Sequence, residues 1–279
     1  MARIDDPLLA RITPALAGVP GVAAVVLGGS RARGTATETS DYDLGLYFQR
    51  GRPLDTEALL RAVRSLVDHP ETAAITPIGE WGPWIVGGGW LRIASKKVDI
   101  LYREIEAVDE VITDASAGRI SMHYQPGHPH GFCSAHWMGE VALCQPLHDP
   151  DRAVAELKAR TQPYPQALAE ALMGKFLWEV GFSIENARLG AARGDATHVA
   201  GCAYRALCCA AQVLFALNAR YLINEKAALE AAQGFPITLV DLSSRVDAVW
   251  RAIGRRDFEP ALETLQSLDS DLRVRCAGA

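Results

Sequence analysis

The sequence lacks the charge excess and the cysteine patterns of several protein classes. Its 279 residues carry 28 Lys and Arg against 33 Asp and Glu, a formal net charge of -5, whereas surfaces that bind a nucleic-acid backbone are usually basic. The six cysteines include no CxxC pair and make no disulfide framework for a chain of this length. We therefore expect reduced thiols and no nucleic acid as the main partner.

Long hydrophobic runs are also missing. The longest apolar stretches, 19–29 and 206–217, are too short to span a bilayer. The N-terminal segment MARIDDPLLARI carries two acidic residues and no apolar core, unlike a signal peptide. We therefore expect a cytoplasmic protein with no membrane partner, and the sequence carries no signal for an oligomeric state.

Proline is absent from a long part of the second half. Thirteen of the fifteen prolines lie at or before Pro165, and the next one is Pro236. Because proline breaks helix interiors, this Ala- and Leu-rich gap predicts long helices over about 165–190 and 196–221, with shorter helices after them. The prolines at 146, 150, 163 and 165 predict a linker. We place two domains at 1–150 and 151–279.

The first half alternates between helix and strand patterns. Apolar residues at helical spacing predict helices over 8–16 and 56–67. The apolar run 22–27 reads as a buried strand, 41–48 alternates with period two, and 90–93 and 98–102 look like two further strands. This order predicts an α+β fold, in which a small mixed sheet with helices on one face precedes an α-helical bundle.

A glycine-rich turn follows the first predicted strand. Gly28, Gly29 and Ser30 let backbone N–H groups approach an anion without a Cβ in the way, and the serine hydroxyl adds a donor. A helix starting after Ser30 would add a favourable dipole for phosphate. Arg31 and Arg33 flank the turn and could neutralise a triphosphate, although Arg33 could equally form a structural ion pair.

Three carboxylates complete a candidate site. Asp41 and Asp43 lie two apart on a predicted strand and therefore project from one face. Their oxygens suit hard cations such as Mg²⁺. Asp99 lies among apolar residues on a second strand, where a charge is costly unless it is paired or metal-bound. With the glycine turn, these are the parts of two-metal phosphoryl or nucleotidyl transfer.

These motifs resemble those of a known superfamily. GGSRARG followed by SDYDLG looks like the glycine–serine and DxD motifs of the DNA polymerase β-like nucleotidyltransferases, and KKVDIL looks like their third-carboxylate strand. The pattern is most similar to the kanamycin-nucleotidyltransferase-like branch, in which a small catalytic domain precedes a helical bundle. The resemblance covers roughly residues 20–103.

The resemblance implies a role for each residue of the site. Asp41 and Asp43 would bind two Mg²⁺ ions, and Asp99 would be a third metal ligand or the general base. Gly29 and Ser30 would hold the β- and γ-phosphates of ATP or another NTP. The implied reaction moves a nucleoside monophosphate, AMP from ATP in the first instance, onto a hydroxyl of a small acceptor.

The acceptor and the helical half leave alternatives open. An aminoglycoside-type antibiotic is one candidate acceptor. The alternatives are a nucleotidyltransferase toxin or RNA-modifying enzyme that acts on tRNA, and a non-catalytic nucleotide-binding module. Related enzymes contact the triphosphate with a basic residue of the helical domain, for which Lys175 is the first candidate and Lys226 the second. Otherwise both lysines are solvated helix charges.

Four histidines and one cysteine fall within a short segment: His123, His128, His130, Cys133 and His136. Their spacing matches no zinc-site pattern. We expect a loop with partly exposed histidines rather than a zinc site.

Three tryptophans lie in the glycine-rich segment GEWGPWIVGGGW. Trp81, Trp84 and Trp90 could line an acceptor or base pocket, but a hydrophobic cap over the sheet is the preferred interpretation. Glu80 beside them is a spare carboxylate that could contact an acceptor.

Overall fold

The structure, a computed structural model, describes residues 6–278. Residues 1–5, part of the segment used to argue against a signal peptide, lie outside the described residues. Contacts divide the chain into two compact units. The first unit holds the chain up to Asp114 together with Trp137–Pro163, and the second holds Ala115–His136 and the chain from Tyr164 onward. The domain boundary predicted at residue 150 falls within the later segment of the first unit.

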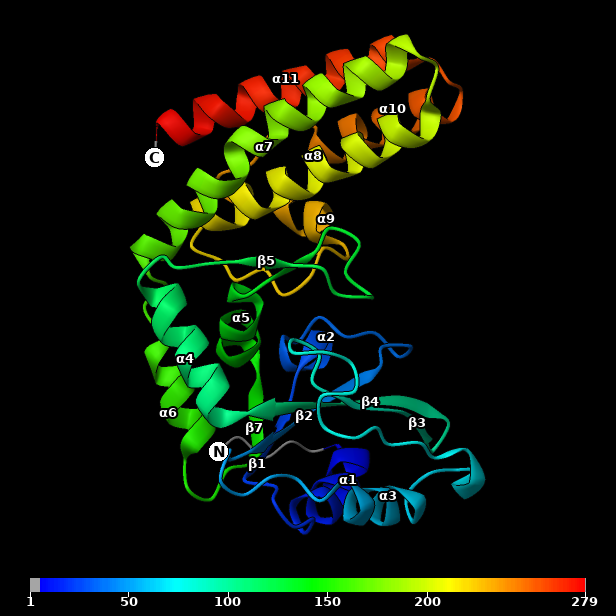
Figure 1. Ribbon diagram of the computed structural model, residues 1–279, viewed down its shortest axis with the longest axis vertical. Helices are drawn as coiled ribbons and strands as arrows, with labels where there is room; N and C mark the ends of the chain where they lie inside the picture. Colours follow the sequence, from blue (N-terminus) through cyan, green and yellow to red (C-terminus); the bar gives the residue numbers. More distant parts are fainter. Residues whose placement is uncertain (1–5, 279) are drawn as a thin grey trace. The chain divides into compact units, whose positions relative to one another are not determined.

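A five-stranded mixed sheet forms the centre of the first unit (Figure 1). Only β2 and β4 pair in parallel among the named strands of this sheet, and the other neighbours pair antiparallel. This arrangement, followed by a helical region, confirms the predicted α+β class. The strand order across the sheet is β3 (Gly88–Ile93), β4 (Lys96–Glu104), β2 (Tyr42–Phe48), β1 (Ala24–Leu27) and β7 (Gln145–His148).

Two amphipathic helices, α1 (Pro7–Ala17) and α3 (Thr56–Arg64), cover one face of this sheet (Figure 1). The side chain of Asp6 accepts hydrogen bonds from the first backbone N–H groups of α1, and Asp55 does the same for α3. Such caps satisfy N–H groups that have no partner inside the helix. The two helices and the sheet share one buried cluster, which includes Leu9, Ile12, Leu16, Leu44, Leu46, Leu59, Val63 and Ile100.

The opposite face of the sheet carries α5 (Ala135–Leu143) and the short α2 (Gly29–Ala32) (Figure 1). Arg103 of β4 is 2% exposed and donates two hydrogen bonds of 2.9 Å to the carboxylate of Glu140 on α5. Its guanidinium also lies over the ring of Trp137. Because the buried charge is paired and hydrogen-bonded, α5 can cover this part of the face.

The segment predicted to be a linker contains the strand β7 and the helix α6 (Ala153–Arg160), and its last prolines, Pro163 and Pro165, lie where the chain passes from the first unit to the second. Pro146 lies inside β7, which pairs with β1 at the edge of the sheet. An edge strand tolerates a residue without an N–H group. Pro165 is the N-cap of the next long helix, a place where proline is also compatible with regular structure. The other elements of the first unit are η1 (Pro70–Thr72) and α4 (Ile105–Ser116).

The second unit is mainly helical. The two helices predicted from the proline gap are confirmed as α7 (Gln166–Ala192) and α8 (Ala196–Leu217), which pack against each other. The last helix is longer than expected. The remaining elements are α9 (Ala228–Gln233), α10 (Leu242–Gly254), α11 (Phe258–Ala277) and the hairpin of β5 (Met122–His123) and β6 (Phe132–Cys133).

Helix α8 is the one helix in the described chain that is long and apolar enough to cross a membrane. However, 72% of its most apolar window is buried, and it contacts α7, α9, α10 and α11. Packing in the core of the second unit therefore accounts for its composition. All six cysteines of the chain are free thiols, as expected.

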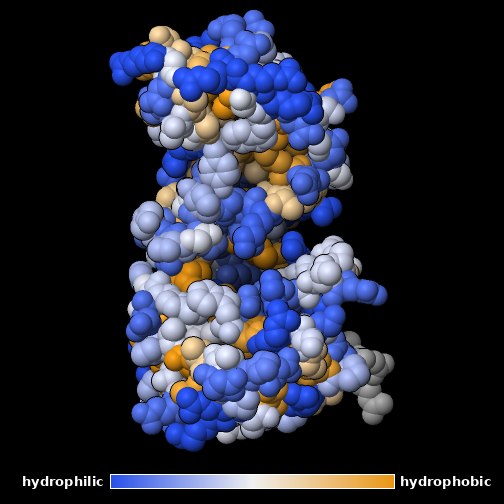
Figure 2. Space-filling model, turned by 90° about the vertical axis from the view of Figure 1, so that its right-hand side faces the viewer, coloured by the Kyte–Doolittle hydropathy of each residue, from blue (hydrophilic) through white to orange (hydrophobic). Residues whose placement is uncertain are grey.

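Large hydrophobic side chains on the surface are mostly isolated. On the face drawn in Figure 2, hydrophobic residues form small separate areas among hydrophilic ones. Helix α7 has the largest exposed group, in which Trp178 and Phe182 contact each other and Leu189 follows on the same helix. Single exposed apolar residues are ordinary on protein surfaces.

The histidine segment of the second unit departs in part from the expected loop of partly exposed histidines, since His123 and His128 are partly exposed but two others are buried. His130 and His136 are 6% and 2% exposed. They pack against aromatic rings, His130 against Phe176 and His136 against Phe132. Within residues 6–278, no group of three or more His, Cys, Asp or Glu residues is arranged to hold a metal ion. The zinc interpretation therefore gains no support.

Burial also changes the acid–base behaviour of these two rings. It lowers the pKa of His136 from 6.5 to about 3, with nearby His128 adding to the effect. It lowers the pKa of His130 to about 4, with Arg205 adding to the effect and Glu225 opposing it. Both imidazoles are therefore neutral in the folded protein at neutral pH.

We predict that the protein loses stability as the pH falls below about 6.5. In that range the unfolded chain binds protons on these histidines while the folded chain does not, so the free energy of unfolding decreases toward acid. Each ring contributes a slope of up to about 1.4 kcal/mol per pH unit. Urea unfolding at a series of pH values should show a smaller slope for His136→Gln than for the wild type. The exposed His198 provides the control, because His198→Gln removes a histidine without changing a buried ring.

Candidate active site

A row of four residues crosses four strands of the first unit's sheet. Gly28, directly after β1, donates its backbone N–H to the carbonyl of Asp43 on β2 at 2.7 Å. Asp43 is the register partner of Asp99 on β4, and Asp99 is the partner of Trp90 on β3. Residues paired in register point to the same face of a sheet. A glycine turn, two carboxylates and an indole therefore lie side by side.

Gly29 is packed directly against the Asp43 side chain. Its φ of +59° lies in the left-handed region, which favours glycine. A Cβ built on Gly29 would lie 1.8 Å from Oδ2 of Asp43, closer than any real contact. The turn and the carboxylate can therefore share this space only while position 29 has no side chain.

Asp41 joins the same face from the segment before β2. It lies two residues before Asp43 and, like Asp43, is half-buried. The guanidinium of Arg31 fixes this segment by donating to the carbonyls of Ser40 at 2.7 Å and Asp41 at 3.1 Å. It also lies 3.7 Å above the ring of Tyr42. Arg31 thus has structural contacts that orient Asp41, a role that the sequence alone did not reveal.

The hydroxyl of Tyr42 extends this connection to the first helix. It donates a hydrogen bond of 2.8 Å to Asp6, the residue that caps α1. Burial, together with this hydrogen bond and the charge of Asp6, raises the pKa of Tyr42, while Arg31 lowers it. The neutral phenol therefore remains a donor over the ordinary pH range.

Helix α2 begins at Gly29, with Gly28 as its N-cap, two residues earlier than expected. Ser30 is half-buried in its first turn. Arg33 is exposed and donates from Nε to the carbonyl of Gly29 at 3.2 Å, a contact that agrees with a structural role. Gln145 of β7 also holds the helix, by donating to the carbonyl of Ala32 at 2.6 Å.

The tryptophans have different environments. Trp90 is 70% exposed, and its ring stacks on that of Trp81 with 4.4 Å between centroids. Trp84 instead packs against Trp137, whose indole nitrogen donates to the Trp84 carbonyl at 3.1 Å. The interpretation as a hydrophobic cap suits Trp84 but not the exposed Trp90. Glu80 is exposed in the turn before Trp81.

The three carboxylates offer the oxygen ligands that Mg²⁺ prefers. In the described chain they do not make up a ready group of three metal-binding side chains. Mg²⁺ usually needs only one or two carboxylates, because water and substrate phosphates complete its coordination. Asp41 and Asp43, beside a turn that has no Cβ at Gly29, therefore fit an ion that arrives with a nucleotide.

The candidate lysines belong to the second unit. Lys175 lies on α7 with its side chain 34% exposed, 3.9 Å from the carboxylate of Glu179. Lys226 is exposed in the turn before α9, and its backbone N–H donates to the side chain of Asn224. Their contact with a triphosphate remains a prediction.

Comparisons with known proteins address the class of this site. Residues 12–120 match the nucleotidyltransferase domain family, and residues 134–226 match a domain of unknown function, DUF4037. A search of curated proteins found no match. Among solved structures, the chain is similar to a nucleotidyltransferase-like protein from Exiguobacterium sibiricum 255-15, with 12% identity and a TM-score of 0.45. That likeness covers 97% of this chain and 76% of the other.

The domain match includes the whole row from Gly28 to Asp99. The first unit therefore contains a nucleotidyltransferase domain, and the protein is a transferase of the nucleotidyltransferase class.

We predict that Gly29→Ala prevents nucleotide binding and lowers stability. Left-handed backbone costs an L side chain about 1–2 kcal/mol, and the new methyl group would displace the Asp43 carboxylate. Gly34 supplies a matched control, because its φ is +71° but nothing lies within 4 Å of a Cβ built there. Gly34→Ala should therefore show the backbone cost alone. Thermal melting would measure the loss of stability, and calorimetric titration with ATP and Mg²⁺ would measure the loss of nucleotide binding. Equal ATP affinity in Gly29→Ala and Gly34→Ala would contradict the prediction.

Proposed function

We propose that the protein transfers a nucleoside monophosphate, most simply AMP from ATP, to a hydroxyl group of a small acceptor. The observation that carries this proposal is the row of Gly28, Asp43, Asp99 and Trp90 across one face of the sheet. It supplies a phosphate-binding turn, a metal-binding carboxylate, a second carboxylate and an open ring surface in that order. The kanamycin-nucleotidyltransferase-like branch and an aminoglycoside-type acceptor are the finer form of the proposal.

Different residues of the chain would bind the phosphates and the metal ion in this reaction. The backbone of Gly29 and the hydroxyl of Ser30 would bind phosphate oxygens. Asp41 and Asp43 would bind Mg²⁺ together with the phosphates of the nucleotide. Bound Mg²⁺ would stabilise negative charge on the phosphates and lower the pKa of the acceptor hydroxyl. Lys175 and Lys226 are the proposed further sources of positive charge for the triphosphate.

Asp99 would act on the acceptor. The acceptor oxygen would form a bond with the α-phosphorus while its proton passes to the Asp99 carboxylate. The bond from the α-phosphorus to the bridging oxygen of the β-phosphate would break, and pyrophosphate would leave with that oxygen. The alternative role of Asp99 as a third metal ligand predicts that its loss also weakens nucleotide binding.

We predict that Asp99→Asn lowers pyrophosphate release by at least about 100-fold, the usual contribution of a general base. If Asp99 is the base, ATP and Mg²⁺ should still bind to the variant. Asp43→Asn should lose both binding and turnover. The assay would combine each NTP with a panel of hydroxylated small molecules and with total tRNA. Asp151→Asn, which changes an exposed carboxylate on a turn, is the matched control and should match the wild type.

The same assay separates the competing functions. Release that depends on tRNA and not on small acceptors would favour an RNA-modifying enzyme. ATP binding without turnover by any acceptor, unchanged in Asp41→Ala, would favour a non-catalytic module. Nucleotide affinity that does not change when Mg²⁺ is added would contradict the metal assignment.

Trp90 is the proposed contact for the ring face of the acceptor. It is the register neighbour of Asp99, and most of its indole is open to solvent above Trp81. We predict that Trp90→Ala raises the KM for the acceptor about threefold to tenfold, as expected for loss of a stacking contact of about 0.5–1.5 kcal/mol. The KM for ATP should not change, and Trp90→Phe should recover most of the loss.

The control for this prediction is Trp178→Ala. Trp178 is also exposed, at 55%, but lies on α7 in the second unit. An equal rise of the ATP KM in Trp90→Ala, or an unchanged acceptor KM, would contradict the assignment of Trp90 to the acceptor.

A further inference from the structure

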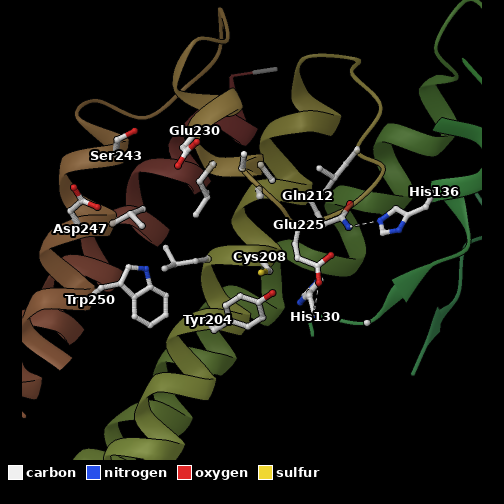
Figure 3. A pocket seen from close by; sticks show the side chains of 18 residues that line it. His130, His136, Tyr204, Cys208, Gln212, Glu225, Glu230, Ser243, Asp247 and Trp250 are labelled. Carbon is white, nitrogen blue, oxygen red and sulfur yellow. Dashed lines mark hydrogen bonds between the residues drawn. The ribbon is translucent and has the colours of Figure 1, made fainter. Parts of the chain in front are cut away.

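The second unit contains a cavity of about 350 Å³ that the proposed reaction does not use (Figure 3). Its walls come from the histidine segment, from α8, from the segment before α9, and from α9 and α10. Its volume is within the usual range of small-molecule sites, about 300–1,000 Å³.

Two residues that line this cavity carry buried ring nitrogens without hydrogen-bond partners. His130 lines it, is 6% exposed, and has no hydrogen-bond partner on either ring nitrogen. His136 also lines it and has none on Nδ1. Buried polar groups are nearly always paired, since an unpaired one loses its hydrogen bonds to water and gains none in return. A bound molecule that donates to or accepts from His130 would replace those hydrogen bonds.

The charges on the cavity wall have one sign. Glu225, Glu230 and Asp247 line it, and its lining contains no Lys or Arg. Burial alone would raise the pKa of Glu225, but hydrogen bonds from His128 and from backbone N–H groups lower it to about 2. Glu225 is therefore ionised at neutral pH, while His130, whose pKa is about 4, carries no charge. Such a wall attracts a cation and repels an anion.

Much of the rest of the wall is apolar and aromatic. Leu207, Leu222 and Val246 line the cavity together with the rings of Tyr204 and Trp250. Figure 3 shows Glu225 and His130 next to each other near the Tyr204 ring, and Trp250 with Asp247 on the side of α10. Aromatic faces attract cations, and aliphatic side chains bury apolar surface. A ligand that suits both the acidic and the apolar parts of the wall has a positive charge on an apolar body.

We propose that this cavity binds a small organic amine whose ammonium group is attracted by the acidic wall and whose apolar body packs against Leu207, Val246 and Trp250. The neutral imidazole of His130 would accept a hydrogen bond from the ammonium group. The lining of this cavity shares no residue with the row of Gly28, Asp43, Asp99 and Trp90, which belongs to the first unit, and its ligand needs neither nucleotide nor Mg²⁺. The geometry of the wall does not favour a metal ion, because the described residues hold no group of three ligating side chains.

Calorimetry on the full chain, without nucleotide, tests the proposal with three probes. Tryptamine has both the charge and the apolar body, tryptophol has the same body with a hydroxyl instead of the amine, and ethanolamine has the charge with almost no body. We expect tryptamine to bind at one site and each of the other two to bind at least about tenfold more weakly. Failure of tryptamine to bind, or equal affinity for tryptophol, would overturn the proposal.

Variants then locate the site. Glu225→Gln and Asp247→Asn should each weaken tryptamine about tenfold, and a thermal melt would check that they fold. Asp247→Asn keeps the test open if Glu225→Gln does not fold, since Glu225 also accepts the backbone N–H of His130. Glu263→Gln, an exposed carboxylate on α11 outside the cavity lining, should bind like the wild type. Equal losses in all three variants would refute the site.

One more variant separates this site from the proposed catalytic function. Asp43→Asn should bind tryptamine as the wild type does, even though we expect it to lose turnover. If Asp43→Asn also loses tryptamine, the probe binds at the catalytic row and the cavity assignment fails. If tryptamine binding depends on Glu225 and Asp247 while no acceptor releases pyrophosphate, the cavity assignment stands and the proposed reaction fails.

Discussion

The rest of the first unit's site depends on the packing of the Asp43 carboxylate against the bare α-carbon of Gly29. This contact brings the turn after β1 next to β2 without a side chain between them. The hydrogen bond from Gly28 to the Asp43 carbonyl fixes the backbone at the same point. Arg31, which follows this turn, donates a hydrogen bond to the carbonyl of Asp41 and so holds the segment that carries this residue. One missing Cβ thus lets the proposed phosphate-binding turn lie directly against the Asp43 carboxylate.

Much of this site could be predicted because the glycine turn, Asp41 and Asp43 lie close together in the sequence. Period-two alternation after residue 40 put Asp41 and Asp43 on one face, and the apolar residues around Asp99 marked a second strand. The alternation of residues along one strand does not show which strands far apart in the chain pair with each other. Trp90 becomes the neighbour of Asp99 only through the register of β3 with β4. The sequence therefore favoured a hydrophobic cap for the tryptophans, with a pocket role as the alternative, and could not show that Trp90 is the exposed one.

The parts that the sequence did not reveal are those that depend on distant packing. His130 and His136 lie in a polar, histidine-rich segment that looks exposed, yet Phe176 of α7 and Gln212 of α8 meet them in the folded unit. Strand β7 and helix α5 follow a segment that belongs to the second unit, so no local order of helices and strands predicts them. The proline at 146 also suggested a break, although an edge strand accepts it.

The edge position of β7 has a consequence for any shortened form of this protein. The match to the nucleotidyltransferase domain ends at residue 120, before β7 begins at Gln145. A fragment cut at that end would leave one side of β1 without its partner, and β1 is the fully buried run Ala24–Leu27. An open, flat and hydrophobic strand edge is a template for pairing with other chains. The late strand β7 thus covers the edge of β1 that could otherwise pair with another chain. The range that matches the nucleotidyltransferase domain, 12–120, does not include this strand.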